Sequence, residues 1–335
     1  MSDRERLEPA LWSILHEAME HDVSYLYITG GSRPLARIGL GELEPLGDHP
    51  VSEGQILRFI DERVPEFQRR LMGSRGYARF VFSIGPGIRC RVDLIKTVKG
   101  QALIIHFVDE TPPRPESLGL QEIIGELVDK KHGVFLICGR PRSGKSTVLA
   151  SLAEEINRKS GKYIVWISHG AEYLFTPHMS FVFQIDIAGH GIEEGVSNLL
   201  KMAPDVLVLD MLLSHNVLEQ ALVLAEVGAQ VFLGVQSTGT VHGLEALTRA
   251  VNYDYRQDFR NRLSRVFESA VYLELVQGVT GIVPATEVLV GIEPVRNLLR
   301  DGKFSHISET IPTGGKYGME TLQKSKERLS AKGLI

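Results

Sequence analysis

Cysteine is scarce in this 335-residue sequence: Cys90 and Cys138 lie far apart, with neither metal-ligand spacing nor a CxxC pattern. A disulfide framework is therefore excluded, and we expect two buried thiols in a reducing compartment. The sequence also has no apolar run approaching the roughly 18 residues of a membrane-spanning helix, and its start, MSDRERLEPALW, has no signal-peptide core. We expect a cytoplasmic protein with no membrane insertion.

Positive charge is not in excess either. The 37 Lys and Arg residues are outnumbered by 41 Asp and Glu, and the formal net charge of −4 creates no overall basic field that would attract nucleic acid. Hydrophobic residues make up 43%, which suits a folded chain and leaves no room for large disordered or collagen-like segments. Because the chain is longer than one hydrophobic core usually serves, two domains are expected.

The first third of the chain indicates a small α+β domain. Residues 7–20 have the periodicity of an amphipathic helix, and apolar stretches broken by Gly and Pro predict strands. These strands are 23–29, 35–38, 77–84, 88–95 and 102–108. Three prolines in DETPPRPES, which begins at Asp109, disfavour both a helix and a central strand. We therefore expect a domain over residues 1–108 and a linker over residues 109–118.

Beyond the linker, short apolar runs alternate with helical periods, which is typical of a parallel sheet covered on both faces. The predicted strands are 134–138, 163–167, 181–185, 206–209, 230–235 and 282–290. After the last of them the chain is predicted to be helical. We expect an α/β domain over residues 119–280 and a mostly helical C-terminal segment over residues 281–335.

A phosphate-binding loop follows the first of these strands. The stretch GRPRSGKS matches GxxxxGK[ST] and lies between the apolar strand GVFLIC and a helical stretch. Glycines let backbone N–H groups surround phosphates, Lys145 places a charge on the β- and γ-oxygens, and Ser146 offers a hydroxyl to Mg²⁺. Arg142 occupies a position that often holds glycine, so its side chain would either assist or crowd the phosphates. The predicted nucleotide-binding residues are Gly139, Arg142, Ser143, Gly144, Lys145, Ser146 and Thr147.

Further landmarks follow in a fixed order. They are IVWISHGAEYL at 164–174, APDVLVLDM at 203–211, LGVQSTGT at 233–240, and a tail over 285–318 that includes an AIRNLIRE-like motif at 294–301; RCRVD lies upstream at 89–93. Together with the phosphate loop, this order resembles the type IV pilus and type II secretion ATPases, in particular the PilT branch of pilus retraction and twitching motility. The resemblance covers nearly the whole chain.

The resemblance implies a PAS-like N-terminal domain, a RecA-like P-loop core and a hexameric ring that binds ATP or ADP with Mg²⁺. Each nucleotide would lie between the N-terminal domain of one subunit and the core of another, with Arg89 and Arg91 facing a neighbour's nucleotide; the alternative is that both are solvated strand residues. A helix carrying Arg296, Asn297 and Arg300 would transmit the output. The implied partners are other copies of the chain, an active PilT-type paralogue and inner-membrane platform proteins, with the ring peripheral at that membrane.

Several positions depart from the family pattern. Where the family has the Walker B glutamate this chain has Met211, whose thioether cannot accept a proton from water. Asp210 precedes it after four apolar residues, which places it either as a Mg²⁺ partner with Ser146 or as an incidental acid at a strand end. The expected metal residues are thus Ser146 and Asp210, while the base is absent.

The remaining departures concern the other family boxes. In the acidic box Ser168 and His169 replace Glu and Asp, which leaves Glu172 as the one carboxylate that could reach the attacking water. Gln236 replaces the histidine of the third box and no longer titrates near neutrality. His106 stands near a family arginine and is a poor substitute for a fixed charge.

These observations predict a nucleotide-binding ring subunit in which ATP hydrolysis is weak or lost, acting as a regulatory or accessory paralogue. The alternative is an active retraction motor that uses Asp210 or Glu172. A RecA-like nucleic-acid motor would rest on fold analogy alone and is opposed by the acidic balance. The scattered histidines His169, His190, His215 and His242 have no ligand spacing, and no metal cluster is expected from them.

Overall fold

The computed structural model describes residues 11–187, 201–211 and 214–335. The chain divides into two compact units, each described separately below. The first unit contains the residues up to Thr111 together with the later segment Gly170–Leu174. The second begins at Pro112, within the stretch predicted as a linker, and continues to Ile335.

The first unit is built on a six-stranded antiparallel sheet in the order β3-β2-β1-β6-β5-β4. Its elements are α1 (Leu11–Glu20), β1 (Tyr25–Thr29), β2 (Leu35–Arg37), β3 (Glu44–Pro45), α2 (Glu53–Arg63), α3 (Glu66–Arg75), β4 (Tyr77–Ser83), β5 (Ile88–Thr97) and β6 (Gly100–Asp109). The helix and the strands predicted here are thus confirmed, although residues 7–10 of the predicted helix lie outside the described residues.

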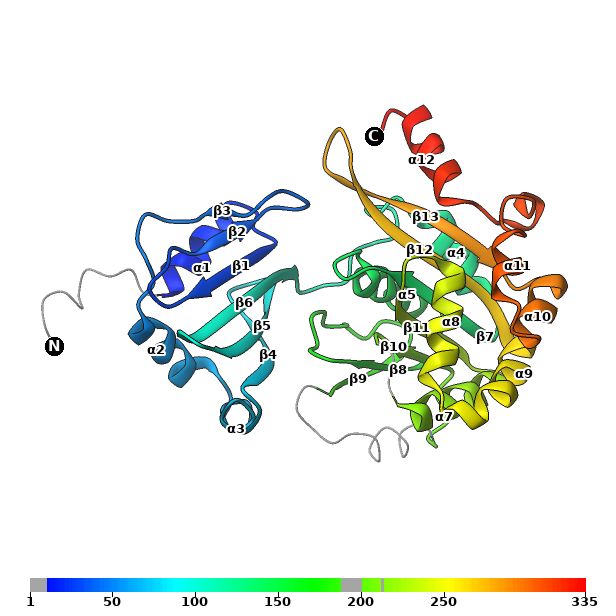
Figure 1. Cartoon of the computed structure of the whole chain (residues 1–335), viewed down its shortest axis with the longest axis horizontal. Helices are drawn as coiled ribbons and strands as arrows, with labels where there is room; N and C mark the ends of the chain where they lie inside the picture. Colours follow the sequence, from blue (N-terminus) through cyan, green and yellow to red (C-terminus); the bar gives the residue numbers. More distant parts are fainter. Residues whose placement is uncertain (1–10, 188–200, 212–213) are drawn as a thin grey trace, which may run out of the picture. The chain divides into compact units, whose positions relative to one another are not determined.

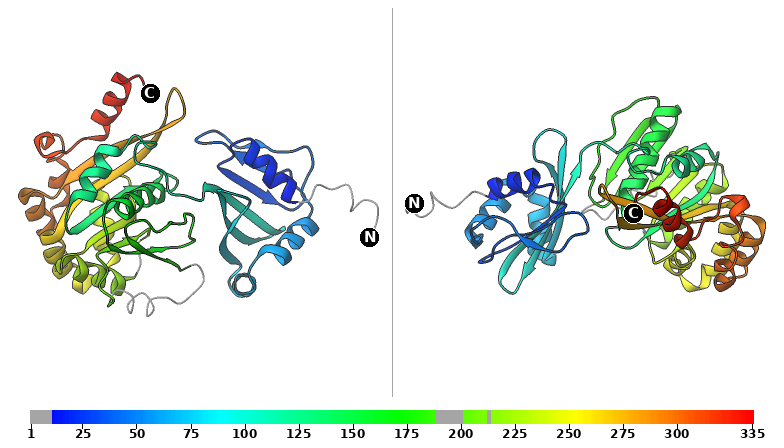
Figure 2. Two further views of the ribbon diagram at one scale, coloured as in Figure 1. Left: turned by 180° about the vertical axis from the view of Figure 1, so that it is seen from behind. Right: turned by 90° about the horizontal axis from the view of Figure 1, so that it is seen from above.

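Alternation along the strands divides the sheet of the first unit into two faces. One face packs against α1 and α2, as the view from above in Figure 2 illustrates, and forms a continuous apolar core. Its fully buried members include Leu26, Val92 and Ile105. The intervening positions Arg91 and His106, which pair across β5 and β6, therefore lie on the opposite face.

The second unit contains a seven-stranded sheet in the order β13-β12-β7-β11-β10-β8-β9 (Figure 1), parallel except for the antiparallel β12–β13 pair. Its strands are β7 (Gly133–Gly139), β8 (Tyr163–Ser168), β9 (Phe181–Asp186), β10 (Val206–Leu209), β11 (Gln230–Gln236), β12 (Phe267–Gln277) and β13 (Ile282–Val290). The strands expected from apolar runs are all present, and the α/β fold class is confirmed.

Helices cover both faces of this sheet (Figures 1 and 2). They are α4 (Gln121–Asp129), α5 (Lys145–Lys159), α7 (His215–Glu226), α8 (Thr240–Ala250), α9 (Arg256–Val266), α10 (Glu293–Arg300), α11 (Phe304–Ser308) and α12 (Leu322–Ala331). On one face of the sheet, the helices α7, α8, α9, α10 and α11 pack with the strands in a single apolar core. On the other face, a side chain at Gly234 would meet Leu149 of α5 at 3.2 Å, so this helix packs close to β11.

Two features of the second unit differ from the sequence expectation. Strand β12 is absent from the predicted strands, because it follows α9 with no intervening residue and its sequence FESAVYLELVQ has no Gly or Pro boundary. The domain boundary expected after residue 280 falls in the turn between β12 and β13. The C-terminal segment therefore begins with a strand of the sheet and becomes helical after Val290.

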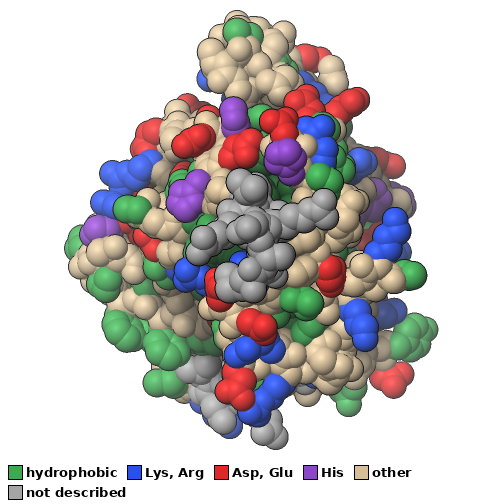
Figure 3. All heavy atoms as spheres, turned by 90° about the vertical axis from the view of Figure 1, so that its left-hand side faces the viewer, with side chains coloured by type: hydrophobic (Ala, Val, Ile, Leu, Met, Phe, Trp, Pro, Cys, Tyr) green, Lys and Arg blue, Asp and Glu red, His purple; other side chains and the backbone are tan. Residues whose placement is uncertain are grey.

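The surface carries mixed charge. In Figure 3, Lys and Arg side chains are interspersed with Asp and Glu over the visible face, in agreement with the near balance of charges in the sequence. Among the described residues, no helix combines the length and the apolar character that crossing a bilayer would require.

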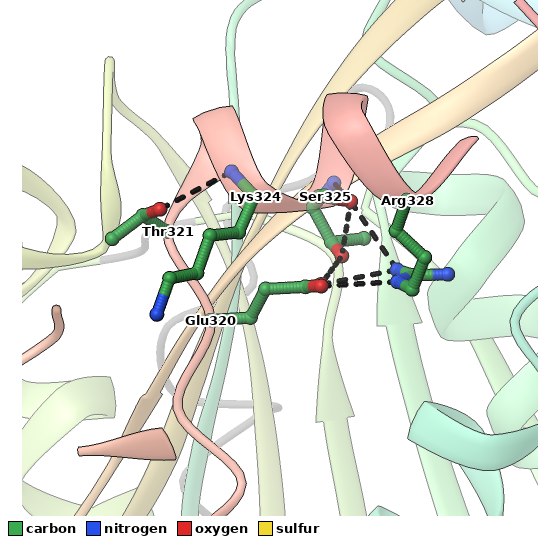
Figure 4. Close-up of polar contacts among 6 residues, drawn as sticks. Glu320, Thr321, Lys324, Ser325 and Arg328 are labelled. Atoms are coloured by element: carbon green, nitrogen blue, oxygen red, sulfur yellow. Dashed lines mark hydrogen bonds and ion pairs between the residues drawn. The ribbon is translucent and has the colours of Figure 1, made fainter. Parts of the chain in front are cut away.

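A polar cluster holds the last helix against β13 (Figure 4). Thr321 caps α12 by accepting a bond from the Lys324 N–H at 3.3 Å, and the Arg328 guanidinium donates two bonds of 3.0 Å to the Glu320 carboxylate. This carboxylate helps to hold the pKa of Arg328 above its ordinary value. Helix α12 is thereby fastened to the sheet by hydrogen bonds as well as by apolar contacts.

The buried hydroxyl of Ser325 is the member of this cluster with the clearest energetic role, because it accepts the buried Thr286 N–H at 3.0 Å. Ser325→Ala is expected to lower the free energy of unfolding by about 1–3 kcal/mol, since the N–H would lose its acceptor. Ser330→Ala, at an exposed position of the same helix, is the matched control. Urea denaturation of both variants tests this, and equal stabilities would contradict it.

Candidate functional site

The loop after β7 needs glycine at both of its ends. Every residue of β7 is buried, and the strand ends at Gly139, where an added Cβ would lie 2.1 Å from the Ser143 Oγ. At the other end Gly144 has φ +85°, in the left-handed region, directly before the first residue of α5. The glycines of the motif therefore let the chain turn tightly from strand to helix, with the N-terminal end of α5 opening at the loop.

The tip of the loop is a tight turn with an unusual residue in it. The Ser143 N–H donates to the Arg140 carbonyl at 3.2 Å, Pro141 is the second residue, and Arg142 is the third with φ +64°. These are the features of a type II turn, in which the third residue is ordinarily glycine because its φ is positive. Holding a residue with a side chain there costs roughly 1–2 kcal/mol.

Lys145 is folded back over this loop. Its Nζ donates to the Arg140 carbonyl at 2.8 Å. Burial lowers the pKa of the Lys145 ammonium, and the nearby Asp210 carboxylate opposes that shift. Ser146 and Thr147 follow in the first turn of α5, both half-buried. The loop thus combines a cation, two hydroxyls and a helix N-terminus, which is the chemistry that binds phosphate and Mg²⁺.

Asp210 reaches the same edge of the sheet from β10. Its N–H donates to the Ile167 carbonyl of the neighbouring β8 at 3.0 Å. On the other side lies Gly234 of β11, where an added Cβ would be only 3.0 Å from the Asp210 backbone, so the two strands approach closely here. Because β7, β11, β10 and β8 are parallel, their carboxyl ends meet at one edge, where α/β proteins bind ligands. The position suits a Mg²⁺ partner of Ser146.

Two of the residues that depart from the family pattern lie at this edge. Met211 follows Asp210 directly and is half-buried, so a thioether occupies the place where a base is expected. Gln236 ends β11 opposite Gly139 of β7, with an exposed side chain. The structure thus places a side chain that cannot act as a base, and one that cannot titrate near neutrality, at the sheet edge that carries the phosphate loop.

The two cysteines are chemically unreactive in this fold. The Cys138 thiol is fully buried at the end of β7, and burial raises its pKa to about 12, while a hydrogen bond from Ser237 works in the opposite direction. The other thiol, Cys90, is buried in the first unit and its pKa is likewise raised by burial to about 12. Neither thiol is a nucleophile near neutral pH.

The altered acidic box is divided between the two units. Ser168 is the buried last residue of β8, and His169 follows it in the second unit. Glu172 belongs to the first unit, where its carboxylate accepts a bond from the Arg91 guanidinium. His106 approaches the same carboxylate, with its Nδ1 3.6 Å from the Glu172 Oε1. Glu172 is therefore the buried centre of a charged cluster.

Arg89 and Arg91 both contact this segment. The Arg89 Nε donates to the Ala171 carbonyl at 3.1 Å, and the Arg89 Nη1 donates to the Ser83 hydroxyl at 3.3 Å. Within one chain the two arginines thus have partners of their own. That they also face a neighbour's nucleotide remains a prediction.

The Tyr25 ring, which no sequence motif indicates, stacks on the His106 imidazole with ring centroids 4.3 Å apart. The two residues are paired across β1 and β6. Period-two alternation in 23–29 and 102–108 places both on one face, but the register between the strands is not readable from the sequence.

Helix α10, whose output role remains a prediction, is anchored in the apolar core of the second unit. Val295 and Leu299 are fully buried, and Leu298 packs against the same core. Arg296 donates to the Glu268 carboxylate at 2.5 Å, whereas Asn297 and Arg300 are exposed. Of the predicted output residues, two therefore present their side chains to solvent. His190 lies outside the described residues, and no group of three metal-binding side chains occurs among the residues described.

A phosphate loop between the first parallel strand and its helix, with an aspartate at the end of a nearby strand, defines a P-loop nucleotide-binding protein of the RecA-like class. The chain belongs to the type II/IV secretion system protein family, whose pattern matches residues 79–258. Within it, the chain lies on the PilT branch of the type IV pilus ATPases.

Relatives and a solved structure support this placement over nearly the full length. The chain is 26% identical over 326 residues to the type IV pilus retraction ATPase PilT of Pseudomonas aeruginosa, covering 96% of this chain and 94% of that protein. It is 27% identical over 322 residues to the uncharacterised Escherichia coli protein YggR, covering 95% and 97%. A crystal structure of the pilus retraction motor PilT with bound ADP matches with a TM-score of 0.81 at 25% identity, covering 98% of this chain and 95% of that one.

Proposed function

We propose that this chain is a nucleotide-binding ring subunit of a type IV pilus or a related filament or secretion machine, in which ATP binding is retained and hydrolysis is weak or lost. It acts as a regulatory or accessory paralogue of an active motor. In this role it is cytoplasmic and peripheral at the inner membrane.

One observation carries the proposal: binding groups and non-catalytic groups lie at the same edge of one sheet. Lys145 begins the helix after β7 and Asp210 follows β10, so both lie at the carboxyl edge of the parallel sheet, which suits a Mg·nucleotide. Met211 follows the end of β10 and Gln236 ends β11 at this edge, where hydrolysis would need a group to orient or deprotonate water. The site can therefore hold phosphates while it lacks the means to activate water.

The nucleotide is ATP or ADP with Mg²⁺, held by the loop and by Ser146 and Asp210. The PilT structure with bound ADP, which matches nearly the whole chain, supports this choice. We further propose a ring of six copies, or a mixed ring with an active PilT-type paralogue, because a head-to-tail interface that closes gives a ring.

A second candidate is an active retraction motor, and the observation that favours it is the position of Asp210 at the sheet edge that carries the phosphate loop. In that case Asp210 or Glu172 would have to orient the water. Glu172 is the weaker choice, since its carboxylate is already engaged by Arg91.

Lys145→Ala is expected to weaken Mg·ATP binding about 10–100-fold, because a hydrogen bond to a charged group contributes about 1.5–3 kcal/mol. Titration with a fluorescent ATP analogue measures the effect. The matched control is Lys159→Ala at the far end of the same helix, where the ammonium pairs with Glu155 at 2.9 Å. If the unsubstituted protein shows no saturable binding, the proposed function is wrong.

A further inference from the structure

Arg142, at the tip of the phosphate loop, has a strained backbone conformation that indicates a functional role for its side chain. Arg142 holds φ +64° at the third position of the turn, although glycine would adopt the same conformation without strain. Strain of this kind tends to persist where a side chain has a role at a site. The question is therefore what a guanidinium at this point does that glycine cannot.

The location of Arg142 in the loop indicates which group its side chain can contact. Arg142 is exposed, two residues before Gly144 and three before Lys145, on the loop whose backbone encloses the phosphates. Its neighbour in the turn, Ser143, is buried and faces the interior of the loop at Gly139. The turn thus directs one residue inward to hold the loop together and leaves the arginine at the outer rim.

The chemistry of the arginine fits a phosphate. A guanidinium is always charged and presents its N–H donors in a planar fork that matches phosphate oxygens, often with two bonds at once. Asp210 places a negative charge at the same sheet edge as Lys145, so a second cation on the loop would strengthen the attraction for a polyphosphate. A triphosphate carries more negative charge than a diphosphate, and an added cation favours the more highly charged ligand.

We infer that Arg142 binds the terminal phosphate of the nucleotide held in its own loop, so that the site selects nucleoside triphosphates over diphosphates. The inference rests on the proposed function and specifies it. Arg142 supplies from within the subunit a charge that acts on the γ-phosphate. A subunit that hydrolyses ATP slowly would then remain in the triphosphate-bound state and signal ATP availability to its ring.

The test compares dissociation constants for MgATPγS and MgADP in the full-length protein. For Arg142→Gly, the dissociation constant for MgATPγS is expected to rise about 10–100-fold, the range of a charge-assisted hydrogen bond, while that for MgADP changes less than about threefold. For Arg142→Lys, the dissociation constant for MgATPγS should lie between that of the unsubstituted protein and that of Arg142→Gly, because lysine keeps the charge but loses the planar fork of N–H donors. The glycine variant should fold well, because it relieves the left-handed strain.

The matched control is Ala203→Gly, at another residue of the second unit with a positive φ, +49°. Ala203 precedes β10, at the sheet edge opposite Asp210, so this variant relieves similar strain away from the phosphate loop. Both glycine variants should show raised melting temperatures, and only Arg142→Gly should lose triphosphate preference.

The outcomes separate the two proposals. If neither nucleotide binds the unsubstituted protein, the proposed function and this inference fall together. If both nucleotides bind, and Arg142→Gly has the same ratio of MgATPγS to MgADP affinity as the unsubstituted protein, the inference alone is overturned. Arg142 would then be a strained residue with no role in nucleotide selection.

Discussion

Steady-state hydrolysis of Mg·ATP by this protein is expected to run about 10²–10⁴-fold below the roughly 1–100 s⁻¹ of active phosphoryl-transfer enzymes. The reason is the composition of the sheet edge beside the phosphate loop. Met211 follows Asp210 where a base is expected, and Gln236 ends the adjacent β11. Release of phosphate, measured with a coupled assay at saturating Mg·ATP, gives the rate directly.

Substitutions that restore the family residues sharpen this prediction. Met211→Glu together with Gln236→His is expected to raise turnover, whereas Met211→Glu alone is expected to restore it only in part. Ser168→Glu is not expected to restore activity, because Ser168 is buried and the end of β8 has no space for a glutamate side chain. Met202→Glu, at an exposed methionine before β10, is the matched control for the added charge.

Two observations together would show that the protein is an active motor. If the unsubstituted protein turns over ATP within the active range, and Asp210→Asn or Glu172→Gln abolishes that activity, the protein is a motor and the accessory role is wrong. Loss through Asp210→Asn alone would assign the water to the β10 edge. Loss through Glu172→Gln alone would assign it to the cluster around Arg91.

The second large effect concerns assembly. Light scattering coupled to size exclusion is expected to give a mass about six times that of the 37.2 kDa chain, because the proposed ring places each nucleotide between two neighbouring copies. Removal of residues 1–111 should abolish self-association and mixed rings with an active PilT-type protein. The second unit has a core of its own, so circular dichroism can verify that the truncated chain is folded.

A monomer at every concentration, with and without nucleotide and with that partner, would contradict this expectation. It would remove the ring and, with it, the role of Arg89 and Arg91 at a neighbour's nucleotide. Their contacts with Ala171 and Glu172 would then be their whole function.

Much of the fold could be predicted from the sequence because the parallel strands are continuous apolar runs. Val206–Leu209, for example, is buried at every residue, and its observed bounds are those that the apolar run predicts. Helix α2 is absent from the predicted elements although it carries a signal: Ser52 and Gln55 form a capping box at its start. Strand β12 has no comparable signal, because α9 runs into it without a break.

The candidate site was predictable to a smaller extent. The phosphate loop is contiguous in sequence, so its residue types and spacing are enough to identify it. The type II turn at Arg142 is visible in the sequence only as an unexpected arginine, since residue identity does not fix a φ angle. The division of the acidic box, with Ser168 in one unit and Glu172 in the other, could not be read from neighbouring positions along the chain.

By itself the sequence determined the class of protein, the phosphate loop and which residue types stand at the positions of the family's boxes, because each of these depends on residue identity over a short span. Only the tertiary structure decided which distant groups meet. It joined Arg91 to Glu172 across 81 positions and placed Asp210 at the same sheet edge as the phosphate loop of Lys145. Such pairs depend on strand register and sheet order, which arise from packing of the whole chain and leave no local pattern.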